Sequence, residues 1–170
     1  MTDVVLVERD GDIATVVFNR PEKLNAFTKA MWKRLGQVVN ELSLDTRLRC
    51  IVFRGAGDRA FSPGNDISEF AKKRSGEEAV AVYNEAVSKA TDALIDARKP
   101  LLAKIDGFCI GGGLGVAMTC DLRIAAADSR FAVPAAKLGL GYKMQGLKIL
   151  VDQVGPAAAK EIFFTARQFD

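Results

Sequence analysis

The chain has 170 residues, of which 49% are hydrophobic and 26% are charged, a composition typical of one globular domain with a sizeable core. Its net charge of +3 is too small to indicate a nucleic acid or an anionic membrane as a partner. The sequence has no histidine, which excludes Ser-His-Asp and Cys-His nucleophiles and HExxH zinc sites. Any catalysis must therefore use carboxylates, Tyr, Lys, water or the backbone.

The N-terminus and the cysteines indicate a cytoplasmic protein. The first ten residues lack the basic, apolar and small-residue order of a signal peptide, and no apolar run approaches the roughly 20 residues that span a bilayer. Cys50, Cys109 and Cys120 are odd in number and lack CxxC spacing. We therefore expect small buried hydrophobic residues at these positions, and neither a disulfide framework nor a metal site.

The first half of the chain alternates predicted strands and helices. Two β-branched runs, Val4 to Glu8 and Ile13 to Phe18, flank an Asp-Gly pair that is typical of an antiparallel hairpin. Apolar residues at helical spacing predict a helix over 26–42, and the run CIVFRG from Cys50 predicts a short buried strand. A helix followed by such a strand indicates an α/β arrangement.

The second half continues the alternation. A helical stripe covers 77–97, Pro100 opens the predicted strand LLAKI, and a further helix is expected over 114–119. After it, DLRIAA and FAVP are predicted as short strands, and 146–153 and 156–166 as helices. Because no repeat or linker interrupts this pattern, residues 1–170 are expected to form one domain.

Two glycine-rich junctions stand where a predicted strand meets a predicted helix. GGGLG at 111–115 precedes one helix, and FSPGNDISEF at 61–70 contains Pro-Gly before another. A helix N-terminus exposes unpaired N–H groups, and glycine lets a ligand atom approach them. Two such donors that converge on one oxygen would form an oxyanion hole. The alternative for the triplet is close packing of a helix on a strand, which needs no ligand.

Four segments in order carry a family resemblance. NRPEKLNAF (19–27), FSPGNDISEF (61–70), KPLLAKIDGFCIGGGLGVAMTCDLRIAAADSRFAVPAAKLGLG (99–141) and VGPAAAKEIFFTARQFD (154–170) strongly resemble the crotonase superfamily, the enoyl-CoA hydratase/isomerase family. The resemblance implies an α/β spiral of repeated ββα units, a homotrimer or hexamer, and a coenzyme A thioester as substrate with no further cofactor. It also implies stabilisation of a thioester enolate in an oxyanion hole made by two N–H groups. Family members continue past FTARQFD, so we expect the C-terminal helical part to be missing.

The resemblance assigns the two oxyanion donors to the backbone N–H groups of Asn65 and Gly112. Pro63, Gly64 and Gly111 accompany them in the two motifs. The side chain of Asn65 either reaches the acyl group or caps the following helix, and capping is the preferred interpretation. Asp66 is also able to cap that helix.

Further positions match those that line the substrate and coenzyme A in the family. Ile67 is expected under the pantetheine or acyl path, and Asp121, outside this set, is expected to be structural. The matching positions are Lys23, Leu24, Ala26, Asp66, Ile67, Pro134, Ala135 and Leu138.

Two departures from the family pattern bear on the chemistry. Family hydratases carry one glutamate two positions after the glycine triplet and another after the proline of FGxPE, whereas this chain has Gly115 and Ala135 there. Neither residue transfers protons, so the residues do not support the usual hydration mechanism, and an isomerase is disfavoured too. The alternatives are a non-hydratase coenzyme A enzyme, such as a decarboxylase, hydrolase or C–C lyase, and a non-catalytic acyl-CoA-binding subunit.

Other titratable groups of the sequence are candidates to replace the two missing glutamates. Glu69, Glu77, Glu78 and Glu85 are each expected on a solvated surface, as is the basic run AKKRSG at 71–76, whose alternative role is contact with coenzyme A phosphates. Tyr142 and Lys143 lie near the expected rim of the pocket. Tyr142 is an acid or base candidate if its pKa is shifted.

Overall fold

The computed structural model describes residues 3–69, 77–142 and 144–170 and contains two β-sheets. In the five-stranded sheet, of order β1-β2-β3-β5-β7, β1 and β2 are antiparallel and the other neighbours are parallel. The second sheet is parallel, with order β4-β6-β8. The strands are β1 (Val5–Asp10), β2 (Ile13–Phe18), β3 (Cys50–Gly55), β4 (Ala60–Ser62), β5 (Leu101–Ile105), β6 (Phe108–Ile110), β7 (Leu122–Ala125) and β8 (Arg130–Ala132).

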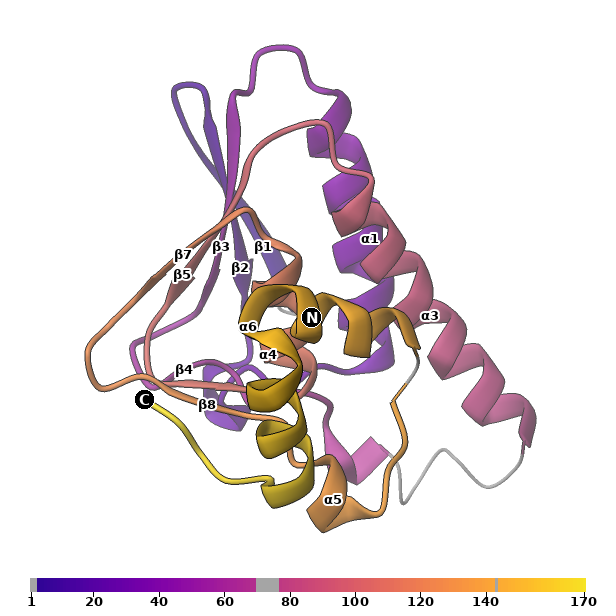
Figure 1. Cartoon of the computed structure of the whole chain (residues 1–170). Helices are drawn as coiled ribbons and strands as arrows, with labels where there is room; N and C mark the ends of the chain where they lie inside the picture. Colours follow the sequence, from indigo (N-terminus) through magenta and orange to yellow (C-terminus); the bar gives the residue numbers. More distant parts are fainter. Residues whose placement is uncertain (1–2, 70–76, 143) are drawn as a thin grey trace.

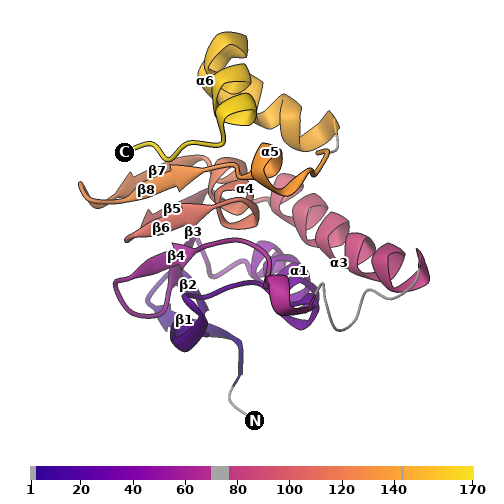
Figure 2. The same ribbon diagram turned by 90° about the horizontal axis from the view of Figure 1, so that it is seen from below.

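The chain winds between the two sheets in a spiral. Each of the consecutive pairs β3 and β4, β5 and β6, and β7 and β8 contributes one strand to each sheet, and a helix follows each pair. Figure 2 shows the strands advancing through the molecule in chain order, with α6 beyond β7 and β8. The expected spiral of ββα units is therefore confirmed.

The helices cover one side of this spiral. Helix α1 begins after Thr28, whose hydroxyl accepts a hydrogen bond from the Met31 N–H, and it packs beside α3 (Figure 1). A Cβ on Gly36 of α1 would lie 3.2 Å from Ala90 Cα of α3, so glycine permits this close approach. The helices are α1 (Lys29–Leu44), α3 (Glu77–Ile95), α4 (Gly112–Thr119), α5 (Ala135–Leu138) and α6 (Met144–Thr165), with a 3-10 turn η1 (Pro21–Lys23).

Aromatic rings form the centre of the core beneath the site. Phe18 makes edge-to-face contacts with Phe27 and Phe61, at ring-centroid distances of 4.8 and 5.2 Å, and all three side chains are fully buried. Such pairs typically add about 1 kcal/mol beyond the burial of their area. Phe27 directly precedes the N-cap of α1 and Phe61 lies in β4, so this cluster packs the start of α1 against β4.

Most of the predicted elements are confirmed, with shifted ends. The hairpin, the CIVFRG strand and the LLAKI strand are present as expected. The predicted helices 146–153 and 156–166 form α6, which breaks at Gly155 (φ 78°) before Pro156. The helix expected over 114–119 begins earlier, at Gly112, and β4 and β6 were missed because three-residue strands show no periodicity.

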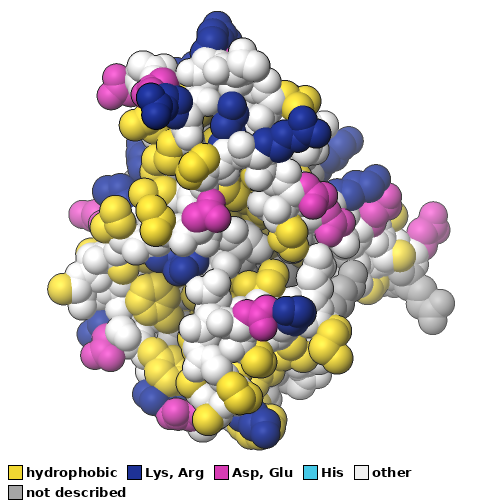
Figure 3. All heavy atoms as spheres, turned by 45° about the horizontal axis from the view of Figure 1, so that its top comes forward, with side chains coloured by type: hydrophobic (Ala, Val, Ile, Leu, Met, Phe, Trp, Pro, Cys, Tyr) yellow, Lys and Arg dark blue, Asp and Glu magenta, His cyan; other side chains and the backbone are white. Residues whose placement is uncertain are grey.

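The surface carries charges of both signs (Figure 3), and two of the three cysteines are buried. Charged side chains of both signs are interspersed with hydrophobic ones on the face in Figure 3. Cys109 and Cys120 are buried and Cys50 is half-buried, all as free thiols. Within the described ranges, no helix has the length and apolarity to cross a membrane, and no cluster of three or more metal-binding side chains is present.

Candidate functional site

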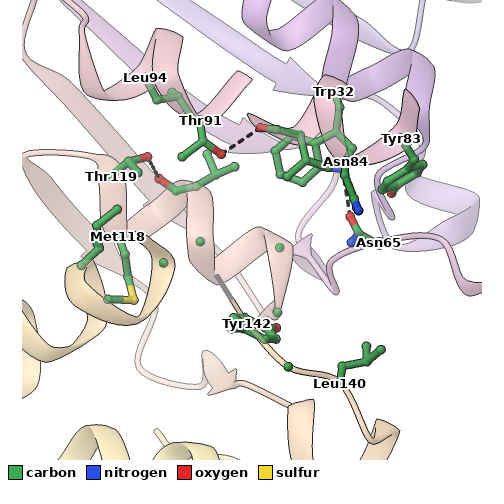
Figure 4. A pocket seen from close by; sticks show the side chains of 18 residues that line it. Trp32, Asn65, Tyr83, Asn84, Thr91, Leu94, Met118, Thr119, Leu140 and Tyr142 are labelled. Atoms are coloured by element: carbon green, nitrogen blue, oxygen red, sulfur yellow. Dashed lines mark hydrogen bonds between the residues drawn. The ribbon is translucent and has the colours of Figure 1, made fainter. Parts of the chain in front are cut away.

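A cavity of about 410 Å³ opens between α3, α4 and the segment that follows α5. Its volume lies within the range of ordinary small-molecule sites. In the view of Figure 4, Trp32, Asn65 and Tyr83 gather at one end of the cavity, Met118 and Thr119 at the other, and Tyr142 along its side. Lining residues also include Asn84, Val87, Thr91 and Leu94 from α3 and Gly112, Gly115 and Val116 from α4.

The two glycine junctions meet at this cavity. A Cβ on Gly64 would lie 2.9 Å from the Gly112 nitrogen, and a Cβ on Gly112 would lie 3.6 Å from Gly64 Cα. Gly64 has φ +95°, a conformation that other residues rarely adopt. The loop after β4 therefore touches the first turn of α4, so the sequence expectation that the two junctions converge is met.

A parallel bridge sets the direction of the Asn65 N–H. The Phe27 N–H donates to Gly64 O at 2.7 Å, and the Asp66 N–H donates to Phe27 O at 2.8 Å. In such a bridge the N–H of the middle residue points away from the partner strand. Within the described part of the chain, neither the Asn65 N–H nor the Gly112 N–H has an acceptor. Two backbone donors are thus left unsatisfied beside one cavity.

A buried polar network fixes the loop that carries Gly64. The Asn25 Nδ2 donates to Ala60 O at 2.7 Å and to Ala56 O at 3.0 Å. The Ser62 hydroxyl donates to Asn25 O at 2.9 Å and accepts from the Gly64 N–H at 3.2 Å. Asn25 is fully buried at φ 64°, a left-handed conformation that asparagine tolerates better than most residues. The sequence reasoning did not single out Asn25, although it lies within the NRPEKLNAF motif.

The residue that caps the helix after Gly64 is Asp66. Its Oδ1 accepts from the Ser68 N–H at 3.0 Å and from the Ser68 hydroxyl at 2.7 Å, while its Oδ2 pairs with Arg20 Nη1 at 3.0 Å. The hydrogen bonds from Ser68, together with those from Arg20, lower the pKa of the Asp66 carboxyl. The preferred role of Asn65 as the cap is therefore wrong.

The Asn65 side chain instead contacts Trp32. The indole Nε1 donates to Asn65 Oδ1 at 2.8 Å, and the Trp32 ring packs on Phe27 with a ring-centroid distance of 4.5 Å (Figure 4). A Cβ on Gly112 would lie 3.3 Å from Asn65 Oδ1. The carboxamide of Asn65 therefore lies close to Gly112. Trp32 was missed because no sequence pattern links it to a loop 33 residues away.

The three consecutive glycines have different environments. A Cβ on Gly113 would overlap the carbonyl oxygen of Ser62, so this glycine allows α4 to pack against β4. Close packing, the alternative explanation of the triplet, thus holds for Gly113, whereas Gly112 lines the cavity. A Cβ on Gly115 would meet no atom within 4 Å, although this residue lines the cavity.

Comparisons with known proteins identify the family of this chain. The family model described as "Enoyl-CoA hydratase/isomerase" matches residues 8–170. The chain belongs to the enoyl-CoA hydratase/isomerase family. A short-chain-enoyl-CoA hydratase of Clostridium acetobutylicum is 34% identical over 96% of this chain, and a crotonyl-CoA hydratase of Syntrophomonas wolfei is 33% identical over 95%.

Solved structures show the same fold. An enoyl-CoA hydratase/carnithine racemase from Magnetospirillum magneticum superimposes with a TM-score of 0.94, at 38% identity over 100% of this chain and 64% of that protein. The chain spans 62% of the length of each of the two curated relatives named above. The crotonase-superfamily resemblance is therefore confirmed.

Because the chain belongs to this family, the side chains of the cavity wall bear on which groups could act as acids or bases in it. Among the described residues, those that line the cavity include no Asp, Glu, Lys or Arg. The acids considered as replacements lie elsewhere: Glu69 accepts from the Lys29 N–H at 2.9 Å, Glu85 pairs with Lys89 at 2.7 Å, and Glu78 is exposed. The side chain of Glu77, Lys143 and the run 71–76 lie outside the described residues.

Tyr142 is one of two tyrosines on the cavity wall. A Cβ on Gly111 would lie 3.9 Å from its hydroxyl oxygen, and its ring packs edge-to-face on Phe163 at 4.9 Å. Burial raises the pKa of the Tyr142 phenol above its ordinary value of 10.0. The hydroxyl therefore stays protonated at neutral pH. Tyr83, the second tyrosine, donates to Phe27 O at 3.4 Å.

The other family-matched positions are not among the residues that line the cavity. Lys23 and Ile67 are exposed, Leu24 is half-buried in a left-handed turn, and Ala26 is buried. Near α5, Leu138 is exposed and Ala135 is 2% exposed, whereas Pro134 Cδ would lie 3.8 Å from a Cβ on Gly111. Asp121 is structural as expected, because its Oδ2 accepts from the Leu101 N–H at 2.7 Å.

Proposed function

We propose that this protein is an acyl-CoA enzyme that holds a thioester oxygen between the backbone N–H groups of Asn65 and Gly112. The observation that carries the proposal is the contact between the loop at Gly64 and the first turn of α4, at a cavity whose described wall carries no charged side chain. Both donors are main-chain groups, so the absence of a particular side chain does not remove them. Family membership supplies the thioester as the matching substrate.

The two donors are expected to stabilise the negative charge that develops on the thioester oxygen. When electrons move onto the thioester carbonyl to form an enolate, preorganised donors in an uncharged cavity stabilise that charge without reorganising. Removing one such donor typically costs about 3 kcal/mol of transition-state stabilisation. Gly112 opens an eight-residue helix, whose N-terminal partial positive charge adds to the effect.

Proton transfer in this cavity falls to Tyr142. The described cavity wall has no carboxylate that could act as a general base. A phenol whose pKa is raised remains protonated at neutral pH, so Tyr142 can donate a proton to an enolate carbon but does not abstract one. This asymmetry favours reactions that generate the enolate without a basic side chain.

Decarboxylation of a 2-carboxyacyl-CoA is a second candidate reaction, favoured because the described part of the cavity wall contains no carboxylate. The bond between the α-carbon and the carboxylate breaks, carbon dioxide leaves, and the electron pair moves into the thioester enolate. The enolate then takes the Tyr142 proton at its α-carbon, and solvent reprotonates the phenolate. No protein base and no external oxidant or reductant is required.

Family membership also suggests where coenzyme A binds and how the subunits assemble. Lys23, Leu24, Ala26 and Ile67 are proposed to contact the pantetheine and nucleotide, and Pro63, Asp66, Pro134, Ala135 and Leu138 to support that surface. A homotrimer or hexamer is proposed as the assembly.

The experiment is turnover in D₂O with a panel of enoyl-, malonyl- and 3-oxoacyl-CoA esters, read by mass spectrometry of the products. We expect at least one product that carries deuterium at its α-carbon, because the enolate is quenched by solvent-derived protons. Binding of these esters without any product would contradict the proposal and indicate a non-catalytic acyl-CoA-binding subunit.

A further inference from the structure

The orientation of the Asn65 carboxamide is fixed by its neighbour. An indole Nε1 is only a donor, so the group that faces it at 2.8 Å must be the Asn65 oxygen. The Nδ2 group, with its two N–H donors, therefore faces away from Trp32. None of the described residues accepts a hydrogen bond from it.

We propose that the Asn65 carboxamide selects acyl-CoA substrates that carry a carbonyl oxygen on the β-carbon. This inference rests on the proposed function and names its substrate class. The Asn65 Oδ1 would lie 3.3 Å from a Cβ on Gly112, so the carboxamide adjoins the pair of backbone donors. A substrate whose thioester oxygen sits between the two N–H groups therefore places its acyl group against this amide.

The spacing of the two hydrogen-bond donors of Asn65 matches that of the two carbonyl oxygens in such a substrate. In asparagine, the backbone nitrogen and Nδ2 are separated by the same number of bonds as the two oxygens of a 1,3-dicarbonyl unit. One residue can thus donate its backbone N–H to the thioester oxygen and its Nδ2–H to the β-carbonyl oxygen. A 3-oxoacyl ketone and a 2-carboxyacyl carboxylate both supply that second acceptor.

Two other polar side chains of the wall, Thr91 and Thr119, already have hydrogen-bond partners. The hydroxyls of Thr91 and Thr119 donate to carbonyl oxygens of their own helices, at 2.9 and 2.7 Å. Asn84 also lines the cavity but is exposed. A plain alkyl chain beside Asn65 would leave the amide N–H groups unpaired, which discriminates against such substrates.

The test compares acetoacetyl-CoA and malonyl-CoA with butyryl-CoA, which has a similar chain but no β-carbonyl. Trp32 is the only tryptophan of the sequence and contacts Asn65, so stopped-flow quenching of its fluorescence reports binding before turnover. We expect the whole wild-type protein to bind at least one β-carbonyl ester about tenfold more tightly than butyryl-CoA. The separate esters show whether a ketone or a carboxylate is the preferred acceptor.

Variants of two asparagines assign the preference. Asn65→Ala keeps the backbone N–H, so butyryl-CoA binding should persist while the preference for the β-carbonyl ester disappears. Asn65→Asp, which keeps the shape of the side chain but replaces the donor with an acceptor, should also abolish it. Asn84→Ala is the matched control and should retain the preference.

The outcomes separate this inference from the proposed function. Butyryl-CoA binding with no wild-type preference would overturn the inference alone, as would a preference that survives Asn65→Ala and Asn65→Asp or is lost equally in Asn84→Ala. No binding of any ester would overturn both.

Discussion

The Trp32 indole donates a hydrogen bond to the Asn65 side chain at 2.8 Å, and this contact ties helix α1 to the loop after β4, which touches the first turn of α4. Phe27 strengthens the connection, because it packs on Trp32 and bridges Asn65 through the backbone. The loop at Asn65 is thus held by two residues of one segment, 27–32, which is distant from it in the sequence. A donor held in this way costs little reorganisation when a ligand binds.

Gly64→Ala should disrupt both donors. The new methyl group would lie 2.9 Å from the Gly112 nitrogen and from Ile110 O, and the φ of +95° is strained for alanine. We expect a loss of about 1–3 kcal/mol in the free energy of unfolding, together with loss of acyl-CoA binding. Urea denaturation and fluorescence titration measure the two effects. Gly57→Ala, at φ +74° with no atom within 4 Å of the added Cβ, is the control for strain alone and should keep binding.

Gly115→Glu should add a carboxylate to the cavity without steric cost. Open space surrounds the position of the new Cβ, and replacing glycine in a helix favours folding by about 0.5–1 kcal/mol. We expect hydration of crotonyl-CoA to rise about tenfold or more, because a general acid–base group then reaches the substrate. The absorbance of the enoyl thioester follows the reaction.

Gly115→Gln provides the matched uncharged variant. It fills the same space but does not transfer protons, so it should leave crotonyl-CoA hydration at the wild-type level. Equal acceleration in both variants, or brisk hydration by the wild type, would show that proton transfer does not depend on this position.

Tyr142→Phe should slow turnover by about 100-fold while substrate affinity changes less than about twofold. The ring keeps its packing on Phe163, and only the hydroxyl near Gly111 is lost. Because burial raises the phenol pKa above 10.0, the wild-type rate should stay level between about pH 7 and 9 and fall only at higher pH. The variant should lack this alkaline decline. A rate profile unchanged by the substitution would contradict the role of Tyr142.

Asp66→Asn should destabilise the protein in a pH-dependent way. Hydrogen bonds from Ser68 and Arg20 hold the pKa of Asp66 below its unfolded value of about 3.9, so the stabilisation is complete above that pH. It is lost as the pH falls through the lower folded pKa. We expect the variant to lose about 2 kcal/mol in the free energy of unfolding near pH 7, with the difference shrinking below about pH 4.

An exposed ion pair serves as the comparison for Asp66. Glu85 pairs with Lys89 at 2.7 Å on the surface of α3, where solvent screens the pair, so Glu85→Gln should leave the free energy of unfolding almost unchanged. Chemical denaturation at several pH values measures both variants. Equal losses in the free energy of unfolding of the two variants would show that the contacts of Asp66 with Arg20 and Ser68 stabilise the protein no more than an exposed ion pair does.

Much of the fold could be predicted from the sequence because turn and helix-start residues lie where the structure has turns and helix starts. The Asp-Gly turn predicted the first hairpin, and Pro156 correctly marked a helix start within α6. The motif around Gly64 and the glycine triplet identified two junctions that do meet. Their contact itself depended on the family resemblance, because spacing along the chain does not determine which loops converge.

The error at Asn65 has a physical explanation. Asparagine and aspartate are both good helix caps, and they occupy adjacent positions here. The bridge between Phe27 and Asn65 decides between them, because it leaves Asp66 at the helix start and Asn65 beside Trp32. Neither that bridge nor the role of Asn25 follows from local sequence, since both depend on segments more than 30 residues apart.

The most direct test of the central claim is the infrared carbonyl frequency of butyryl-CoA labelled with ¹³C at the thioester carbon, bound to the protein. Two N–H donors on the thioester oxygen should move the frequency of the bound carbonyl below that of the ester in water. The shift should persist in Asn65→Ala, which retains the backbone N–H, and vanish in any Gly64→Ala protein that still binds. An unshifted carbonyl frequency in the saturated wild-type complex would contradict the oxyanion hole at Asn65 and Gly112.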